Sequence, residues 1–195
     1  KYFITAQRRI NSNKKLNIIK THNFAGSING FPFSNSDNTS GFIYIVRDPR
    51  AVAVSFSYHQ NISFEKSVSM MLNPNLLAHN GKYTEARLSW KIHVLSWMNS
   101  PWPKVLIKYE NLHNDTKNHF KKILLFLSKF IKIDIDEEKI NKTVKKCSFE
   151  NLSKLENQKG FSEKKGNVNF FRKGLINEWE EVLPYELKRK IETNF

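Results

Sequence analysis

The chain has 195 residues, of which 39% are hydrophobic and 13% aromatic, so its composition is that of a folded globular domain and excludes a disordered segment. Its formal net charge of +14 favours an anionic partner such as a nucleotide, a nucleic acid, an acidic glycan or a membrane surface, and charge alone does not choose among them. The single cysteine, Cys147, excludes an internal disulfide, and the absence of long apolar runs and of a signal-peptide pattern agrees with a cytoplasmic protein.

Strand-like and helix-like patterns alternate along the first half of the chain. A short strand is predicted at Leu16–Lys20 and a second strand, buried on both faces, at Gly41–Val46; the loop between them is rich in Gly, Ser and Asn. Asp48 and Pro49 have the residue types of an N-cap and a first-turn position, which predicts that a helix begins there. Further helices are predicted at Phe64–Leu72 and Thr84–Met98, with a loop at residues 73–83.

The second half of the chain continues this alternation. A third strand is predicted at Lys104–Leu112, an amphipathic helix from Phe120 to Phe130, and a basic loop at Gln158–Gly174. Helical patterns also cover Asp134–Lys146, Ser148–Glu156 and Pro184–Glu192. With no internal repeat and no linker, these elements predict one domain, residues 1–195, with a three-layer α/β fold in which helices flank a mostly parallel central sheet.

The stretch YIVRDPRAVAVSFSYH places Arg47 at a strand end and Ser55 inside the following helix. Ligands of open parallel sheets bind beyond the carboxyl ends of the strands, where helix N-termini present free N–H groups, and an arginine fork suits phosphate oxygens. One interpretation is that Arg47 and Ser55 hold an anion. The local pattern leaves a second one equally open, in which Arg47 pairs with Asp48 or another acid and Ser55 is an ordinary helix residue.

Two further polar segments are predicted at the same edge of the sheet or in a nearby loop. Lys20 and His22 end the first predicted strand, so strand ends would bring His22, Arg47 and Tyr109 to one rim, where a histidine serves as a base and a lysine stabilises negative charge. A lone histidine is more often structural. The segment FFRKG has the composition to close on a phosphate, although a solvated basic loop explains it better in isolation.

In combination, these segments resemble the cytosolic (aryl, alcohol and amine) sulfotransferases, which use 3′-phosphoadenosine 5′-phosphosulfate (PAPS). Five segments resemble the family's motifs in the family's order and span Lys20 to Trp179: IIKTHN, YIVRDPRAVAVSFSYH, VLIKYENL, CSFENL and FFRKGLINEW. The resemblance implies the sulfotransferase fold, related to that of P-loop proteins, and transfer of a sulfuryl group from PAPS to a hydroxyl or amine of a small-molecule acceptor, with PAP as the second product.

The resemblance also implies roles for individual residues. His22 would take the proton of the acceptor in a single in-line displacement, and Lys20 would contact the transferred sulfuryl group. Arg47 and Ser55 would bind the 3′-phosphate, and Tyr109 would lie by the adenosine. The remaining nucleotide contacts would come from Cys147, Ser148 and Phe149, against the adenine, and from Phe171, Arg172, Lys173 and Gly174, the last three of which would close on the 3′-phosphate.

The chain also departs from the family's pattern. It contains no Pro-Lys-Ser-Gly-Thr-Thr-Trp-type loop, which in the family cradles the 5′-phosphosulfate, and we therefore expect an N-terminal piece to be missing. Asn23 and Phe24 replace the usual Leu-Pro, and Cys147 replaces a threonine. Residues 180–189 do not match the family's C-terminal dimerisation segment, so dimerisation through that segment is not supported.

Three other functions are alternatives for this sequence. A carbohydrate sulfotransferase is disfavoured by the KTH segment, because the glycan enzymes commonly use an acidic base, and a PAP-binding homologue without activity is suggested by the missing loop. A basic nucleic-acid-binding module is suggested by the charge, but no binding motif accompanies it, so no nucleic-acid partner is expected. No metal is expected either, because HExxH, CxxC and similar ligand spacings are absent.

Overall fold

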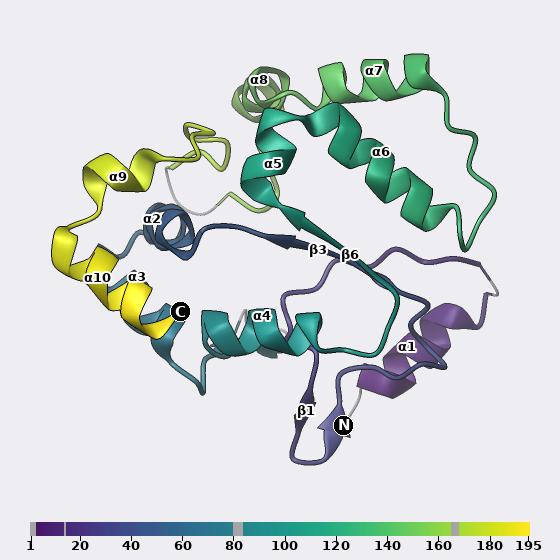
Figure 1. Ribbon diagram of the computed structural model, residues 1–195, viewed down its shortest axis with the longest axis horizontal. Helices are drawn as coiled ribbons and strands as arrows, with labels where there is room; N and C mark the ends of the chain where they lie inside the picture. Colours follow the sequence, from purple (N-terminus) through teal and green to yellow (C-terminus); the bar gives the residue numbers. More distant parts are fainter. Residues whose placement is uncertain (1–2, 14, 80–83, 165–167) are drawn as a thin grey trace.

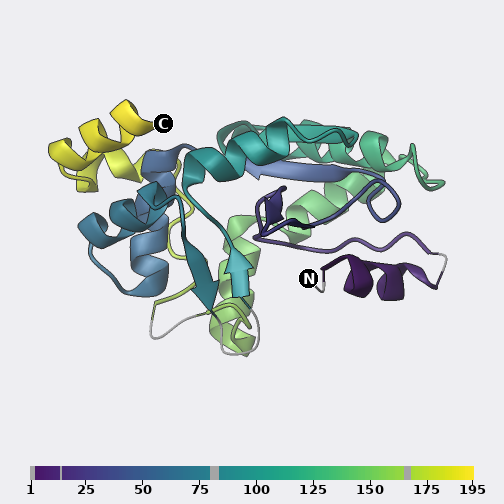
Figure 2. The ribbon, with the colours of Figure 1, turned by 90° about the horizontal axis from the view of Figure 1, so that it is seen from below.

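The computed structural model describes residues 3–13, 15–79, 84–164 and 168–195, and so leaves residues 80–83 and 165–167 of two expected loops outside the described residues. The helices are α1 (Phe3–Asn11), α2 (Pro49–Gln60), α3 (Phe64–Leu72), α4 (Trp90–Met98), α5 (Tyr109–Asn114), α6 (Thr116–Leu127), α7 (Glu137–Lys146), α8 (Phe149–Lys159), α9 (Glu178–Val182) and α10 (Tyr185–Asn194). Helices α9 and α10 lie beside α2 and α3 at one end of the molecule, and α1 lies at the other end (Figures 1 and 2).

The strands form three two-stranded sheets among the described residues. The pair that positions the site is parallel: β3 (Phe42–Val46) runs beside β6 (Lys104–Lys108) with Val46 opposite Lys108. The antiparallel pairs are β1 (Ser27–Ile28) with β2 (Phe31–Pro32) and β4 (Leu77–His79) with β5 (Thr84–Ala86). The α/β class is therefore confirmed, with one parallel strand pair at the centre of the ribbon in Figure 1.

The junction between β3 and α2 follows the sequence signals. Asp48 is the N-cap of α2, its side chain accepts a hydrogen bond from the backbone N–H of Arg50 at 2.8 Å, and Pro49 occupies the first turn. An N-cap carboxylate stabilises a helix by satisfying a free N–H group, and proline costs nothing there because its missing N–H has no partner in the helix. A strand that ends in Arg-Asp-Pro therefore turns directly into a helix.

The largest buried cluster lies between α2, α3 and α10. Its members are the buried residues Ala53, Val54, Val68, Met71, Leu183 and Ile191. Ser67 is also buried and donates a hydrogen bond from its hydroxyl to the Ala53 carbonyl at 2.7 Å, so this buried polar side chain is satisfied. This core holds α2, and with it the helix face that carries Ser55, against the C-terminal helices.

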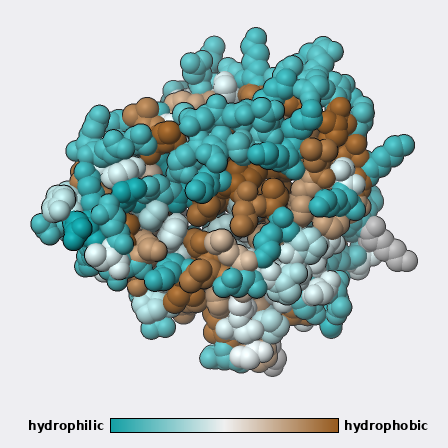
Figure 3. Space-filling view, viewed as in Figure 1, coloured by the Kyte–Doolittle hydropathy of each residue, from teal (hydrophilic) through white to brown (hydrophobic). Residues whose placement is uncertain are grey.

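One face of β3 packs against α4 through aromatic rings. The ring centroids of Phe42 and Trp97 are 4.8 Å apart, and those of Tyr44 and Trp97 are 6.2 Å apart. The burial on both faces expected for β3 is not found: Ile45 is 49% exposed, and Leu106 on β6 is 42% exposed. Among the described residues, β6 is also the only strand paired with β3. Figure 3 shows apolar side chains around a hollow near the centre of this side of the molecule.

Three sequence-based boundaries were wrong. Residues 16–20 form no strand, and Ile18 is 73% exposed, because no strand pairs with them in the described part of the chain. Thr84–Ala86 belongs to β5 instead of a helix, and α4 begins only at Trp90 after its N-cap Ser89. The strand expected to reach Leu112 ends at Lys108, where α5 begins.

Four other elements were not expected from the sequence. These are α1, α9, the β1–β2 hairpin and β4, which lies in the loop expected at residues 73–83. The hairpin turns at Asn29 and Gly30, which have φ angles of 51° and 80°, as the Asn-Gly type I′ turn requires. Within the described residues, no helix combines the length and the apolar character needed to span a bilayer.

Candidate functional site

The parallel register of β3 and β6 brings Arg47 and Tyr109 together, because each residue directly follows the last residue of its strand. The Arg47 guanidinium carbon lies 4.5 Å from the centroid of the Tyr109 ring, and its Nη2 donates to the Leu175 carbonyl at 2.9 Å. The Nε of Arg47 is buried and has no hydrogen-bond partner among the described residues. The alternative in which Arg47 pairs with Asp48 is thus not the one adopted.

Asp48 and Glu110 hold the backbone of this strand end. The Asp48 N–H donates to Glu110 Oε1 at 2.9 Å, while the Asp48 carboxylate forms an ion pair with Arg50 at 2.6 Å. Burial works to raise the pKa of Asp48, but the hydrogen bonds from Arg50 outweigh it and hold that pKa below its ordinary value. Arg50 also stacks on Trp179 at 3.7 Å, so it supports the junction and does not face the pocket with Arg47.

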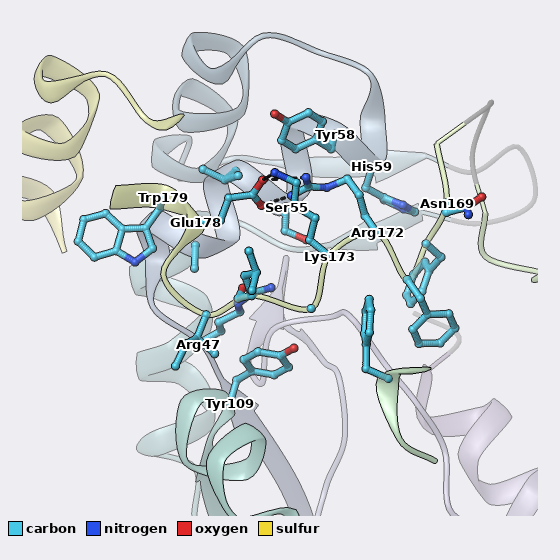
Figure 4. A pocket seen from close by; sticks show the side chains of 18 of the residues that line it. Arg47, Ser55, Tyr58, His59, Tyr109, Asn169, Arg172, Lys173, Glu178 and Trp179 are labelled. Carbon is cyan, nitrogen blue, oxygen red and sulfur yellow. Dashed lines mark hydrogen bonds and ion pairs between the residues drawn. The ribbon is translucent and has the colours of Figure 1, made fainter. Parts of the chain in front are cut away.

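A pocket of about 340 Å³ opens beyond the two strand ends, a volume within the range of small-molecule sites. Figure 4 shows Arg47 and Tyr109 on one side of it and Tyr58, Arg172 and Glu178 on the other. Of the ten residues predicted to bind a nucleotide, eight line this pocket: Arg47, Ser55, Tyr109, Phe149, Phe171, Arg172, Lys173 and Gly174. The walls thus combine three cationic side chains with aromatic rings.

The far wall is built around Glu178, at the start of α9. Arg172 Nη1 donates to Glu178 Oε1 at 2.8 Å, Arg172 Nη2 donates to Glu178 Oε2, and Lys173 Nζ lies 2.9 Å from Oε1. The hydrogen bond from Arg172 is the main cause that holds the pKa of Glu178 below its ordinary value. The Arg172 guanidinium also stacks over the Tyr58 ring at 3.9 Å, so FFRKG is not a freely solvated loop.

The loop backbone before Arg172 is held by a second buried carboxylate. Glu156, on α8, is 4% exposed and accepts hydrogen bonds from the backbone N–H groups of Phe170 at 2.7 Å and of Phe171 at 2.9 Å. These bonds satisfy a carboxylate that would otherwise be costly to bury. They also fix the direction in which the chain enters the Arg172–Gly174 turn.

Gly174 allows an aromatic ring to approach the backbone closely. Its φ is +66°, and a Cβ at this position would lie 2.7 Å from the Phe149 ring. Phe149 in turn begins α8, whose N-cap is Ser148. Cys147 caps the C-terminus of α7 and, like Ser148, does not line the pocket. These two residues therefore place Phe149 instead of contacting the pocket themselves.

Lys20 and His22 lie outside the pocket lining, in a segment that forms no strand with any described residue. Both Lys20 Nζ–Glu163 contacts are short, at 2.6 and 2.7 Å. The hydrogen bond from Lys20 is the main cause that lowers the pKa of Glu163 below its ordinary value, and the nearby His22 and the pocket residue His59 contribute to it less. Glu163 therefore lies within electrostatic reach of the expected catalytic pair and of one wall of the pocket.

The backbone at His22 is anchored from α4 and β5. Trp97 Nε1 donates to the Asn23 carbonyl at 3.0 Å, and the Ala86 N–H donates to Asn23 Oδ1 at 2.9 Å. His93 shares a 2.9 Å hydrogen bond with the Tyr44 hydroxyl through Nδ1. Partial burial, followed by the charge of Arg87, lowers the pKa of His22 below 6.5, which favours the neutral form that a base needs.

Several pocket residues were missed from the sequence. Ala51 and Tyr58 lie four residues before and three residues after Ser55 on α2, so helical spacing places them on its face and was the signal available. Glu178, and Glu156 outside the pocket lining, carry no such signal, because their partners lie across a loop or in another segment. Among the described residues, no three His, Cys, Asp or Glu side chains are grouped to hold a metal ion.

The chain is similar to known sulfotransferases. A family model described as "Sulfotransferase domain" matches residues 2–195. The chain is 25% identical to amine sulfotransferase of Oryctolagus cuniculus over 178 residues, which cover 84% of this chain and 56% of that protein. It is 33% identical to sulfotransferase 2A2 of Rattus norvegicus over 153 residues, which cover 71% of this chain and 49% of the relative.

A plant relative and a solved structure agree with these matches. Cytosolic sulfotransferase 17 of Arabidopsis thaliana is 28% identical over 167 residues, which cover 77% of this chain and 46% of the relative. The chain thus spans about half the length of the curated relatives it matches. The crystal structure of mouse sulfotransferase SULT7A1 complexed with PAP aligns with a TM-score of 0.57 at 24% identity, over 77% of this chain and 55% of that chain, a likeness in fold.

Proposed function

Because the chain belongs to the sulfotransferase family, we propose that it transfers a sulfuryl group from PAPS to a hydroxyl or amine of a small acceptor. The observation that carries this proposal is the buried Nε of Arg47, a cationic donor without a partner among the described residues, on the wall of a pocket of about 340 Å³. A buried donor left unpaired costs about 1–3 kcal/mol, so an oxygen atom of a bound ligand would relieve that cost.

The charge and shape of the pocket support a phosphorylated adenosine. In this proposal Arg47, Ser55 and the Arg172–Gly174 turn hold the 3′-phosphate, since arginine forks, a hydroxyl and loop N–H groups all bind phosphate oxygens. Tyr109 and Phe149 supply ring faces for the nucleoside. Two solved structures of the same fold, a mouse sulfotransferase and a retinol dehydratase, contain PAP, which supports PAPS as the co-substrate.

The chemistry is proposed as one in-line displacement. The neutral imidazole of His22 takes the proton of the acceptor hydroxyl or amine as its oxygen or nitrogen forms a bond to sulfur. The bond between sulfur and the oxygen of the 5′-phosphate breaks, and PAP leaves with that oxygen. Lys20 stabilises the negative charge on the sulfuryl oxygens, so its ion pair with Glu163 must open first; both partners are more than 40% exposed, which makes that exchange inexpensive.

Three broader features belong to the same proposal. Residues 1–195 form part or all of a single sulfotransferase domain, whose three-layer arrangement and larger parallel sheet are supported by the β3–β6 pair and by the solved structures. The acceptor is a small molecule. A cytoplasmic location is supported by relatives named cytosolic sulfotransferases.

The test is a binding and transfer experiment on the purified protein. Isothermal titration calorimetry should show PAP binding, and 5′-AMP, which lacks the 3′-phosphate, should bind markedly more weakly. Transfer of ³⁵S from labelled PAPS to a panel of phenols, alcohols, amines and sugars should identify the acceptor class. Failure to bind PAP would refute the proposal, whereas PAP binding without transfer to any acceptor would favour a PAP-binding homologue.

A further inference from the structure

Glu178 is the one acidic residue among those that line the pocket in the described part of the chain. Its side chain is 7% exposed and lies between Arg172 and Lys173 at the opening of α9 (Figure 4). The hydrogen bond from Arg172 holds its pKa low, so the carboxylate is ionised at neutral pH. The contact is therefore a buried carboxylate with two cationic partners.

This carboxylate uses the same donors that a phosphate would use. Both terminal nitrogens of Arg172 donate to Glu178, one to each carboxylate oxygen, and Lys173 approaches Oε1 at 2.9 Å. Arginine binds phosphate through this same pair of parallel N–H donors. A phosphate at this wall and Glu178 thus compete for one set of hydrogen bonds.

The net charge of the pocket side chains is consistent with this competition. Arg47, Arg172 and Lys173 are positive and Glu178 is negative, which leaves two positive charges in excess. A phosphate monoester carries close to two negative charges at neutral pH. With Glu178 in place, the pocket matches a phosphate dianion, and the carboxylate prevents three cations from lying together unpaired when no ligand is bound.

The exchange does not require Arg172 to leave its place. Its guanidinium is stacked on the Tyr58 ring at 3.9 Å, and the backbone before it is held by Glu156. By contrast, the pair of Lys20 with Glu163 is exposed on both sides and is screened by solvent, so it contributes little to selection. Only the buried pair is positioned to set how strongly the pocket binds an anion.

We propose that Glu178 is a specificity-determining residue of the nucleotide site: it occupies the Arg172–Lys173 pair when the site is empty and yields these donors to the 3′-phosphate. This inference rests on the proposed function, because it takes PAP and PAPS as the ligands. It predicts that Glu178 lowers affinity for PAP while it stabilises the empty protein. A residue with a merely structural role would stabilise the empty protein and would also favour PAP binding.

The experiment compares the wild type, Glu178→Gln and the control Glu181→Gln, which removes the same charge from an exposed position of the same helix. In calorimetry, Glu178→Gln should bind PAP about tenfold more tightly, since the phosphate no longer competes with an adjacent negative charge. Affinity for 5′-AMP should change much less, and Glu181→Gln should resemble the wild type. Without ligand, the Tm of Glu178→Gln should fall, and saturating PAP should restore it.

The outcomes separate the two proposals. Wild-type protein that does not bind PAP would refute the proposed function itself. Wild-type binding together with unchanged or weaker PAP affinity in a folded Glu178→Gln variant would refute only the role of Glu178, as would an equal gain for 5′-AMP. If Glu178→Gln does not fold, Glu178→Asp replaces it: the shorter carboxylate keeps the charge but loosens the pair, so PAP affinity should still rise, and a fall would overturn the inference.

Discussion

Replacing Arg47 with alanine should weaken PAP binding strongly while leaving the fold nearly as stable as before. Arg47 stands at the end of β3, with its guanidinium over Tyr109, one bond to the Leu175 carbonyl and a buried Nε that has no partner among the described residues. A hydrogen bond between charged groups contributes about 1.5–3 kcal/mol. With about 1.4 kcal/mol for each factor of ten, PAP affinity should fall about 10- to 100-fold.

The effect on stability is a difference between opposing contributions. Truncation loses about 1 kcal/mol for the hydrogen bond to Leu175 and about 0.5–1 kcal/mol for the stacking on Tyr109. It also removes the buried Nε, whose missing partner costs about 1–3 kcal/mol in the empty protein. These contributions nearly cancel, so the free energy of unfolding should change by less than about 1 kcal/mol.

Calorimetric titration with PAP, combined with urea unfolding, separates binding from folding. Arg47→Lys should recover only part of the affinity, because lysine keeps the charge but not the planar fork. Arg189→Ala, which removes a positive charge from an exposed position of α10, serves as the control for net charge. If Arg47→Ala and Arg189→Ala bind PAP equally well, Arg47 is not a phosphate ligand and the reasoning from its unpaired Nε is wrong.

Three further predictions follow from the site. His22→Ala should leave PAP affinity unchanged and reduce kcat by about 10²–10⁴-fold, the usual contribution of a positioned base. Steady-state rates and calorimetry test this, and unchanged turnover would exclude His22 as the base. Burial lowers the pKa values of His22 and His93, so both histidines favour the neutral form in the folded state. We therefore expect kcat/KM and the free energy of unfolding to stay constant above pH 6.5 and to fall as the pH drops below it. Rate profiles and thermal unfolding from pH 8 to 5 test this, and a loss of either quantity that begins above pH 6.5 would contradict it. Gly174→Ala should displace Phe149 and weaken PAP binding, because its Cβ would lie 2.7 Å from that ring at a φ of +66°; unchanged PAP affinity would show that the ring does not contact the nucleotide.

The parts of the site that the sequence predicted are those fixed by neighbouring residues in the chain. Arg47 lies beyond β3 because Asp48 and Pro49 end the strand and begin a helix, and this signal is local. Ser55 follows from the helical spacing on α2. Tyr109 follows from the end of β6, although that strand is shorter than expected because Tyr109 already belongs to α5. Chain order and secondary-structure period were sufficient for these three residues.

The strand expected at residues 16–20 shows why local pattern was not sufficient elsewhere. Its β-branched residues favour an extended backbone, but the segment has no regular secondary structure, because a strand also needs a neighbour to receive its hydrogen bonds. No pairing partner lies beside it in the described residues, so Ile18 and Ile19 remain 73% and 56% exposed. His22 is placed instead by contacts from α4 and β5 to Asn23, which no periodicity in the sequence indicates.

The carboxylates illustrate the same limit, and they bear directly on function. Glu156 binds the backbone before Arg172, Glu163 pairs with Lys20 and Glu178 pairs with Arg172. In sequence, however, they are three ordinary acidic residues in a basic region. Their effects differ because their burial differs: an exposed pair exchanges with solvent at little cost, whereas a buried pair must exchange with another anion. In the proposed site, the sequence therefore identifies the cations that would meet a phosphate, and the burial of their internal partners would determine how readily they do so.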